Sequence, residues 1–397
     1  MPRDPGEPTS SADVLAQTGD WLIRDARFLP GNKEILAHFC ERVAGAGIPI
    51  DRVSLHQLAF HPQYRGVARV WWSDKPMDEL FFDHGIEKTT TYRQNPLRPV
   101  IEEGKTVEYR LDGNETNYPY PMLGELRERG FTHYVIAPLK YAIGITNGFS
   151  WATRRPGGFT PGEMRFFHAI LAPYAAVAEL KALRRFIGGI LETYVGTEAG
   201  KLILDGQVQR GDTRAITAAL MLVDLRDFTA MSDRLSPRAV IRTLNQYFDC
   251  VMPPVYENGG EVVEIMGDGV LAIFQHGHDR TAAEACESAL AAATAGLAAL
   301  GERNRAHPAT PLRAGVALHY GTVSYGNIGA GNRLDFTVIG PDVNMTSRIE
   351  RLCRELDRNL ITSETFADTL ARPMWEIGHF DLRGFVKMQR LFELPPA

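Results

Sequence analysis

Hydrophobic and polar positions are most clearly patterned in the second half of the chain. ITAALMLVDL, residues 216–225, is an apolar run of strand length. A helix is predicted to follow from Ser236 and Pro237, because apolar residues then recur with a period of about 3.6 residues. Pro253 and Pro254 predict the end of that helix, since proline disfavours helical geometry in the residue before it.

The remaining patterns of this half complete an order of elements. Residues 259–274, GGEVVEIMGDGVLAIF, indicate two strands joined by a tight turn, and an alanine-rich helix is predicted at about 280–303. Segments 312–320 and 322–328 indicate another strand pair, followed by a helix from about 341 to 356 and by short strands. The order β-α-β-β-α-β predicts an α+β, ferredoxin-like sheet with its helices on one face.

The first half mixes helix and strand patterns over residues 20–162. The preceding residues 1–19 are polar and rich in proline and serine, which predicts a disordered leader. Thr160, Pro161 and Glu163 have the N-cap, first-turn and capping-box pattern of a helix start. A helix is therefore predicted to begin at the end of this first domain.

That helix is predicted to continue to about Gly196, within a helical linker over residues 163–211. Its apolar residues follow alternating steps of three and four, which fits an imperfect two-stranded coil. A single helix packed on its own domain gives much the same pattern, so both arrangements stay open. The second domain is predicted over residues 212–397.

The composition is that of a soluble globular protein. The 397 residues are 44% hydrophobic and 23% charged, which is enough for two or three domains with a sizeable core. The net charge of −5 gives no basic surface, so no nucleic-acid partner is expected. The four cysteines lie far apart and no segment is typical of a membrane span, which together predict a cytoplasmic protein without a membrane partner.

Two aspartates of the second domain stand where carboxylates have chemical use. Asp224 ends the apolar strand 216–225, and Asp268 lies in the Gly-Asp-Gly turn between two apolar strands. In an antiparallel core these positions can be neighbours, and two carboxylates beside a helix N-terminus suit a divalent metal and a phosphate. A pair of ordinary turn aspartates is the alternative, because aspartate is common beside glycine in hairpins.

A third stretch, RLDFTVIGPDVNMTSRIE (333–350), carries an amide and a guanidinium on one helix face. Asn344 and Arg348 are four residues apart. Such a pair suits a polyanionic transition state, although an isolated pair of this kind is most often solvated surface.

Together with VDLRDFT (223–229), GGEVVEIMGDGVLAIF and GVALHYGTVSYGNIG (315–329), this stretch resembles the class III nucleotidyl cyclases, the adenylate and guanylate cyclase family. The resemblance spans about residues 212–394, with the motifs in the family's order and spacing.

The resemblance implies an active site formed between two catalytic domains, hence a homodimer. Asp224 and Asp268 match the aspartates that hold two Mg²⁺ or Mn²⁺ ions. Asn344 matches the residue that orients the ribose, and Arg348 the one that stabilises transition-state charge; both would come from the other protomer. In the first motif, Phe228 and Thr229 are candidate substrate-binding residues.

Two positions depart from the family pattern. Where the family often has a lysine for the triphosphate, this chain has Phe385, and either Lys387 or Arg333 is expected to replace it. Glu264 and Thr337 occupy the positions that select the purine. Glutamate accepts hydrogen bonds from guanine N1–H and N2–H and meets adenine N1 unfavourably, which favours GTP. Soluble bacterial members of this kind mostly use ATP, so the prediction is an adenylate cyclase, with guanylate cyclase as the alternative.

Other functions remain open at this point. Residues 20–162 resemble a GAF-like sensory domain at the level of fold only, which implies an unknown small-molecule or protein signal. GGEVV superficially resembles the signature of diguanylate cyclases, and Phe385 with Glu264 is compatible with a catalytically silent scaffold. In the hairpin 259–274, Glu261 is expected to be solvated and without a role.

Overall fold

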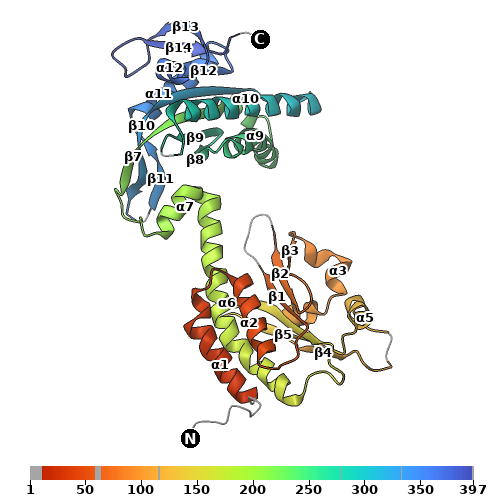
Figure 1. Cartoon of the computed structure of the whole chain (residues 1–397). Helices are drawn as coiled ribbons and strands as arrows, with labels where there is room; N and C mark the ends of the chain where they lie inside the picture. Colours follow the sequence, from red (N-terminus) through yellow and green to blue (C-terminus); the bar gives the residue numbers. More distant parts are fainter. Residues whose placement is uncertain (1–10, 59–63, 115–116, 278, 332, 396–397) are drawn as a thin grey trace. The chain divides into compact units, whose positions relative to one another are not determined.

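The computed structural model describes residues 11–58, 64–114, 117–277, 279–331 and 333–395. The chain divides into two compact units, unit 1 (Met1–Ile190) and unit 2 (Leu191–Ala397). Each unit has its own β-sheet, as Figure 1 shows, and side chains of each unit form its own hydrophobic core.

Unit 1 is built on a six-stranded antiparallel sheet in the order β3-β2-β1-β6-β5-β4. The strands are β1 (Arg52–Leu58), β2 (Gly66–Trp72), β3 (Asp78–Phe82), β4 (Val107–Arg110), β5 (His133–Lys140) and β6 (Thr146–Thr153). The helices are α1 (Ser11–Arg24), η1 (Ala26–Phe28), α2 (Asn32–Gly45), η2 (Ile86–Lys88), α3 (Thr90–Arg93), α4 (Leu97–Glu103), α5 (Pro121–Glu128) and α6 (Pro161–Val195). One core joins α1, α2 and α6 to the sheet, and a second core lies between the sheet and α4 and α5.

The start of the chain differs from its prediction. Residues 11–19, assigned to a disordered leader, form the first part of α1, and Val14 and Leu22 of this helix are buried in the core. The apolar side chains spaced along one helix face outweigh the polar composition that suggested a leader. Residues 1–10 of the predicted leader lie outside the described part of the chain.

Helix α6 begins and ends close to its predicted bounds. The backbone N–H of Glu163 donates to Thr160 Oγ1, and the Thr160 N–H donates to Glu163 Oε2 at 2.7 Å, which completes the capping box. The helix passes through Pro173 and ends at Val195. By length and composition alone this helix could cross a membrane. However, 44% of its most apolar 18-residue stretch is buried inside the protein, and core helices of soluble proteins can have the same length and composition.

Unit 2 is built on an eight-stranded sheet in the order β13-β14-β12-β10-β7-β9-β8, with β11 paired to β10. The strands are β7 (Thr213–Leu225), β8 (Glu261–Met266), β9 (Gly269–Gln275), β10 (Ala314–Ala330), β11 (Arg333–Ile339), β12 (Leu360–Ser363), β13 (Trp375–Phe380) and β14 (Gln389–Glu393). The helices are α7 (Thr197–Leu204), α8 (Phe228–Ser232), α9 (Pro237–Glu257), α10 (Ala282–Ala306), α11 (Pro341–Glu355) and α12 (Glu364–Thr369). The central order β10-β7-β9-β8 is that of the predicted ferredoxin-like unit.

Two predictions for this unit are wrong. Helix α9 does not end at Pro253 and Pro254 but continues to Glu257. Val251, Pro254 and Val255 are all buried, so packing of this face outweighs the backbone donors that the prolines lack. The strand pair predicted over 312–328 is one continuous strand, β10, because β7 pairs with it along nearly its whole length.

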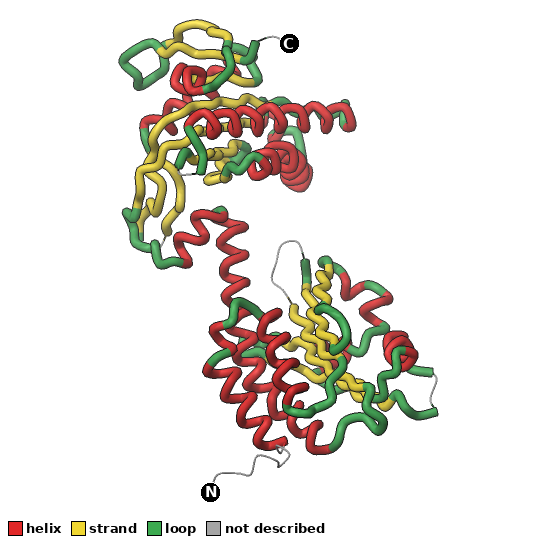
Figure 2. The backbone as a smooth tube through the Cα atoms, in the orientation of Figure 1, coloured by secondary structure: helices red, strands yellow, loops and turns green. Residues whose placement is uncertain are grey.

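The two faces of this sheet differ. Alternate residues of β7, among them Met221 and Val223, face a core shared with α9 and α10. Leu220 and Leu222 face the opposite side, where α11 contacts β10 and β7. Asp224 follows Leu222 in this alternation and therefore points to the side without α9 and α10. The far ends of β7, β10 and β11 run together past the part of the sheet that α10 covers (Figure 2).

Candidate active site

The end of β7 and the β8–β9 turn bring Asp224 and Asp268 together. Val223 pairs with Val270 of β9, so Asp224 lies beside the turn that contains Asp268. A Cβ on Gly269, the residue after Asp268, would lie 3.5 Å from Asp224 Oδ1, which is an ordinary van der Waals distance and shows how close the turn lies to Asp224. Burial, followed by the negative charge of Asp224, raises the pKa of Asp268 to about 6. Two carboxylates forced into one half-buried place favour a bound cation.

The backbone just after Asp224 turns sharply. Asp227 adopts a left-handed conformation with φ 59°, which is uncommon for a residue other than glycine. Helix α8 begins directly after it, at Phe228. Phe228 packs against the core beneath the sheet, and Thr229 is exposed. The turn therefore places these two candidate residues at the start of a short helix, a few residues after Asp224.

Two charged residues of α11, which the sequence analysis did not select, lie beside the carboxylate pair. Arg354 Nη2 donates to Asp224 Oδ2 at 2.9 Å. Burial and the charge of Asp224 raise the pKa of Glu350 to about 7. Glu350 and Arg354 are four residues apart, so they share one face of the helix, and Glu350 comes two residues after Arg348. This spacing is the sequence signal that could have found them.

The donor set fits a divalent metal ion. Carboxylate oxygens are the ligands that Mg²⁺ and Mn²⁺ prefer, and Asp224 supplies them from the end of β7 and Asp268 from the β8–β9 turn. Among the described residues no group of three histidine, cysteine or acidic side chains has metal-binding geometry. The candidate ligands are therefore the two aspartates alone.

The purine-selecting candidates also meet. Thr337 Oγ1 donates to Glu264 Oε2 at 2.8 Å, and Thr337 is almost fully buried. A bulge in β8 between Val262 and Glu264 shifts the strand by one residue relative to β9. Without it, Glu261 and Glu264 would point to opposite faces of the sheet; with it, both point to the side that carries β11.

Glu261 is not solvated as predicted. It accepts hydrogen bonds from the backbone N–H of Glu198, at 3.1 Å, and from the hydroxyl of Tyr325, at 3.2 Å. Burial raises its pKa above the usual range. The sequence prediction failed because the bulge that turns Glu261 inward depends on pairing with a distant strand.

Asn344 and Arg348 share one face of α11. Asn344 is exposed, and Arg348 is partly buried with its Nε atom lacking a hydrogen-bond partner. At about 100° per residue, Glu350 lies roughly 160° around the helix from Arg348. One helix thus presents Glu350 and Arg354 to its own carboxylate pair and Asn344 and Arg348 in a different direction. Within the described residues of one chain, no hydrogen bond or ion pair joins Asn344 or Arg348 to the carboxylates.

Comparison with known proteins decides what this arrangement is. Residues 212–389 match the family described as "Adenylate and Guanylate cyclase catalytic domain". This region is a class III nucleotidyl cyclase catalytic domain.

Curated relatives carry the same domain in longer chains. The adenylate cyclase of Anabaena cylindrica is 31% identical over 200 residues, which are 49% of this chain and 38% of that protein. Adenylate cyclase 1 of Rhizobium meliloti is 32% identical over 145 residues, 36% of this chain and 22% of that protein. The chain thus spans less than half the length of these relatives. Among solved structures, the adenylyl cyclase CyaB from P. aeruginosa matches with a TM-score of 0.43 and 21% identity, over 47% of this chain and 97% of that one.

The candidates for the triphosphate contact lie at separate places in the cyclase domain. Phe385 packs against the small core beneath α11, which gives this position an apolar role instead of the family's lysine. Lys387 is exposed in the loop between β13 and β14, and Arg333 is exposed at the start of β11. The structure brings neither of them to Asp224 or Asp268.

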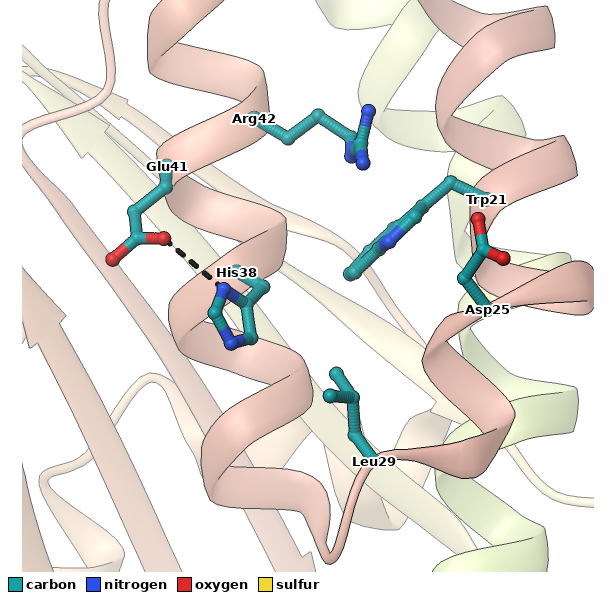
Figure 3. A pocket seen from close by; sticks show the side chains of 6 residues that line it. All are labelled: Trp21, Asp25, Leu29, His38, Glu41 and Arg42. Carbon is teal, nitrogen blue, oxygen red and sulfur yellow. Dashed lines mark hydrogen bonds and ion pairs between the residues drawn. The ribbon is translucent and has the colours of Figure 1, made fainter.

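Unit 1 contains a hollow of about 500 Å³ between α1 and α2 (Figure 3). Its lining consists of Trp21, Asp25, Leu29, His38, Glu41 and Arg42. The Arg42 guanidinium lies over the Trp21 ring at 4.8 Å, and His38 Nδ1 is 3.2 Å from Glu41 Oε2. None of the residues from the cyclase motifs lines this hollow.

Proposed function

We propose that the chain is a nucleotidyl cyclase that converts ATP to 3′,5′-cyclic AMP and pyrophosphate as a homodimer. The observation that carries the proposal is the meeting of Asp224 and Asp268 at one edge of a cyclase-family sheet, with the pKa of Asp268 raised by burial and by its neighbour. Structural carboxylates are usually paired with cations or backbone donors, whereas this pair shares one exposed arginine.

Asp224 and Asp268 are the residues that would hold two Mg²⁺ or Mn²⁺ ions. When bound, such ions lower the pKa of the ribose 3′-hydroxyl and neutralise triphosphate charge. The reaction forms a bond from the 3′-oxygen to the α-phosphorus and breaks the bond to pyrophosphate, with loss of the hydroxyl proton. Most of the rate acceleration is then expected from positioning and charge stabilisation.

The other residues act on the substrate directly. Following the family resemblance, Asn344 orients the ribose and Arg348 donates to the oxygens that gain charge in the transition state. Lys387 or Arg333 would contact the triphosphate, and Phe228 with Thr229 would line the site. Because Asn344 and Arg348 face away from the carboxylates of their own chain, two protomers would complete each other's sites.

ATP is proposed as the substrate because the similar curated proteins are named adenylate cyclases. GTP is the second candidate, and the contact between Glu264 and Thr337 favours it. In this contact the Thr337 hydroxyl donates its proton to Glu264, so both side chains offer acceptors. Guanine N1–H and N2–H suit Glu264, while adenine satisfies an acceptor only with its amino group. Guanine O6 would then require the Thr337 hydroxyl to turn.

The test is product analysis of the full-length protein with Mn²⁺ and either ATP or GTP. Glu264→Lys should raise the ATP:GTP ratio of kcat/KM by about tenfold or more, since that corresponds to about 1.4 kcal/mol of differential binding. Glu302→Lys is the matched control, because this substitution makes the same charge change at an exposed position of α10. An unchanged ratio would exclude Glu264 from the purine site, and a cyclic dinucleotide product would indicate a diguanylate cyclase instead.

Regulation by unit 1 is part of the proposal, with a soluble signal as the input and the cytoplasm as the location. The sheet covered by helices on both faces and the continuous helix α6 support a sensor that leads into a linker. Removal of residues 1–200 should change basal activity or dimerisation. An unchanged rate and an unchanged oligomeric state would contradict regulation.

A further inference from the structure

A buried polar network lies at the start of α11, apart from the carboxylate pair and the purine contact. His319 of β10 is 4% exposed. Its Nε2 lies 3.2 Å from Asp342 Oδ1, and its Nδ1 lies 2.7 Å from Ser363 Oγ. With a proton on Nε2, His319 donates to Asp342, while its Nδ1 bonds the Ser363 hydroxyl and lies 3.3 Å from Thr365 Oγ1.

The network is structural and not a nucleophilic triad. Ser363 is 4% exposed, and its Oγ also accepts the Phe366 N–H at the N-cap of α12. A hydroxyl committed in this way has no access to a substrate. The network therefore connects elements: α12 through Ser363, β10 through His319, and the first turn of α11 through Asp342.

Asp342 is held by β10 at two points. Its Oδ1 accepts from His319, and its Oδ2 accepts from the Thr322 N–H at 2.7 Å. Gly321 makes this approach possible, because a Cβ at that position would overlap the Asp342 carboxylate. The segment from His319 to Thr322 thus holds the Asp342 carboxylate by two hydrogen bonds and by its close approach to Gly321.

The helical period relates this anchor to the proposed transition-state residues. At about 100° per residue, Asn344 lies roughly 160° around α11 from Asp342, and Arg348 roughly 120°. Asp342 points to β10, whereas Asn344 is exposed. The anchor and the functional pair therefore lie on different faces, and the anchor fixes the rotation and the height of the helix that carries the pair.

We propose that His319 and Asp342 are positioning residues, which act through Asn344 and Arg348 by fixing how α11 presents them to the site of the partner protomer. The proposal rests on the proposed cyclase function and on a site shared by two protomers. Misplacement of a transition-state group by about 1 Å can cost on the order of 100-fold in rate.

Single variants of the full-length protein give the first test. Asp342→Ala and Gly321→Ala should each lower kcat by about 10- to 100-fold with little change in KM for ATP, because the metal and purine groups are untouched. Glu355→Gln removes a carboxylate from the exposed end of the same helix, and Gly277→Ala adds a methyl where no atom lies within 4 Å. Both controls should keep wild-type kcat. A kcat within twofold of wild type for Asp342→Ala would overturn the proposal.

Mixed dimers separate positioning from general damage. In a dimer of Asp224→Ala and Asp342→Ala protomers, one site combines intact carboxylates with an intact α11. Such a mixture should recover roughly a quarter of wild-type activity, since about half the dimers are mixed and each has one complete site. A mixture of Asp342→Ala with Arg348→Ala should recover nothing, because both defects affect α11.

Each outcome has one meaning. Recovery with Asp224→Ala and none with Arg348→Ala supports the proposal. Recovery with neither partner shows a folding defect in Asp342→Ala, and recovery with both shows an intact α11; either result overturns it. The pair Asp224→Ala with Arg348→Ala tests the proposed function itself: without recovery there, the shared two-protomer site fails, whatever Asp342 does.

Discussion

Buried ionisable groups occur in both units, but their surroundings differ. In unit 1, Arg155 pairs with Glu163, Arg69 donates to Glu79 at 2.7 Å, and Glu179 accepts two backbone N–H groups at 2.8 and 3.0 Å. Hydrogen bonds to Arg155 and to Thr160 outweigh burial and lower the pKa of Glu163.

In unit 2, three acids share one place. After burial, the charge of Asp224 contributes most to the raised pKa values of Asp268 and Glu350, and Arg354 is the cation bonded directly to Asp224. Burial and mutual repulsion raise the pKa values of Asp268 and Glu350. The two sets of acids therefore differ in their partners. Acids that stabilise the fold are paired with cations or backbone donors of the chain, whereas acids that bind a ligand lack enough such partners.

The largest expected effect is on catalysis. Asp224→Asn should lower kcat/KM by about 10³-fold or more, because it removes a charged metal ligand. Unfolding by urea should be unchanged or shifted to higher urea, because repulsion is relieved. A cyclase assay and an unfolding curve of the same preparation check both parts. A variant that loses stability together with activity would assign Asp224 to the fold, like the acids of unit 1.

The matching change in unit 1 should affect stability only. Glu163→Gln leaves Arg155 without its carboxylate and weakens the helix cap, at a cost of about 1–3 kcal/mol. Urea unfolding followed by the tryptophan fluorescence of unit 1 measures this cost. Basal cyclase activity per folded molecule should stay at the wild-type level, and a large loss of kcat would contradict the distinction between the units.

The acids near Asp224 and the acid Glu163 of unit 1 should contribute to the pH dependence of stability with opposite signs. The folded pKa of Asp268, about 6, lies above the unfolded value of about 4. The stability that Asp268 contributes is therefore fully present below pH 4 and is lost as the pH rises through 6. Glu350, with a pKa of about 7, extends this loss of stability to higher pH. The lowered pKa of Glu163 acts in the other direction, with stability lost as the pH falls below its usual range.

Thermal unfolding of the metal-free protein from pH 4 to 8 checks these signs. The transition of unit 2 should move to lower temperature as the pH rises, and Asp268→Asn should flatten this trend. Added Mn²⁺ should stabilise unit 2 more at pH 8 than at pH 5. A transition that rises with pH and ignores Mn²⁺ would show that these acids are already neutralised.

The smallest expected effect concerns Arg354. Arg354→Gln should tighten Mn²⁺ binding by about threefold, because a positive charge that competes for Asp224 is removed from a solvent-exposed pair. Arg351→Gln is the control, since Arg351 pairs with Glu355 on the same helix. Calorimetry without nucleotide measures binding directly. Equal Mn²⁺ affinity in both variants would mean that Arg354 does not compete with the metal for Asp224.

The features that the sequence predicted are local ones. Asp224 ends an apolar strand and Asp268 lies in a glycine turn, so their types and positions follow from short patterns; the helix bearing Asn344 and Arg348 follows from its period. The GAF-like character of unit 1, the metal ions and the substrate stay predictions.

What the sequence missed depends on distant pairing. The bulge at Val263 exists only against β9, and it brings Glu264 to the same face of the sheet as the partly buried Glu261. Arg354 and His319 could not be selected from the sequence because their partners, Asp224 and Asp342, lie more than twenty residues away in the chain. The continuation of α9 through its prolines likewise depends on the core that covers it.

The contact of Glu261 with α7 has a consequence for communication within unit 2. Glu261 holds the first turn of α7, and Glu264 lies three residues further along the same strand, about 10 Å away. A bulged strand is held by fewer ladder bonds than a regular one. Any coupling between α7 and the contact of Glu264 with Thr337 through this strand would be reciprocal: a shift of α7 that strengthened nucleotide binding would in turn be favoured by the bound nucleotide.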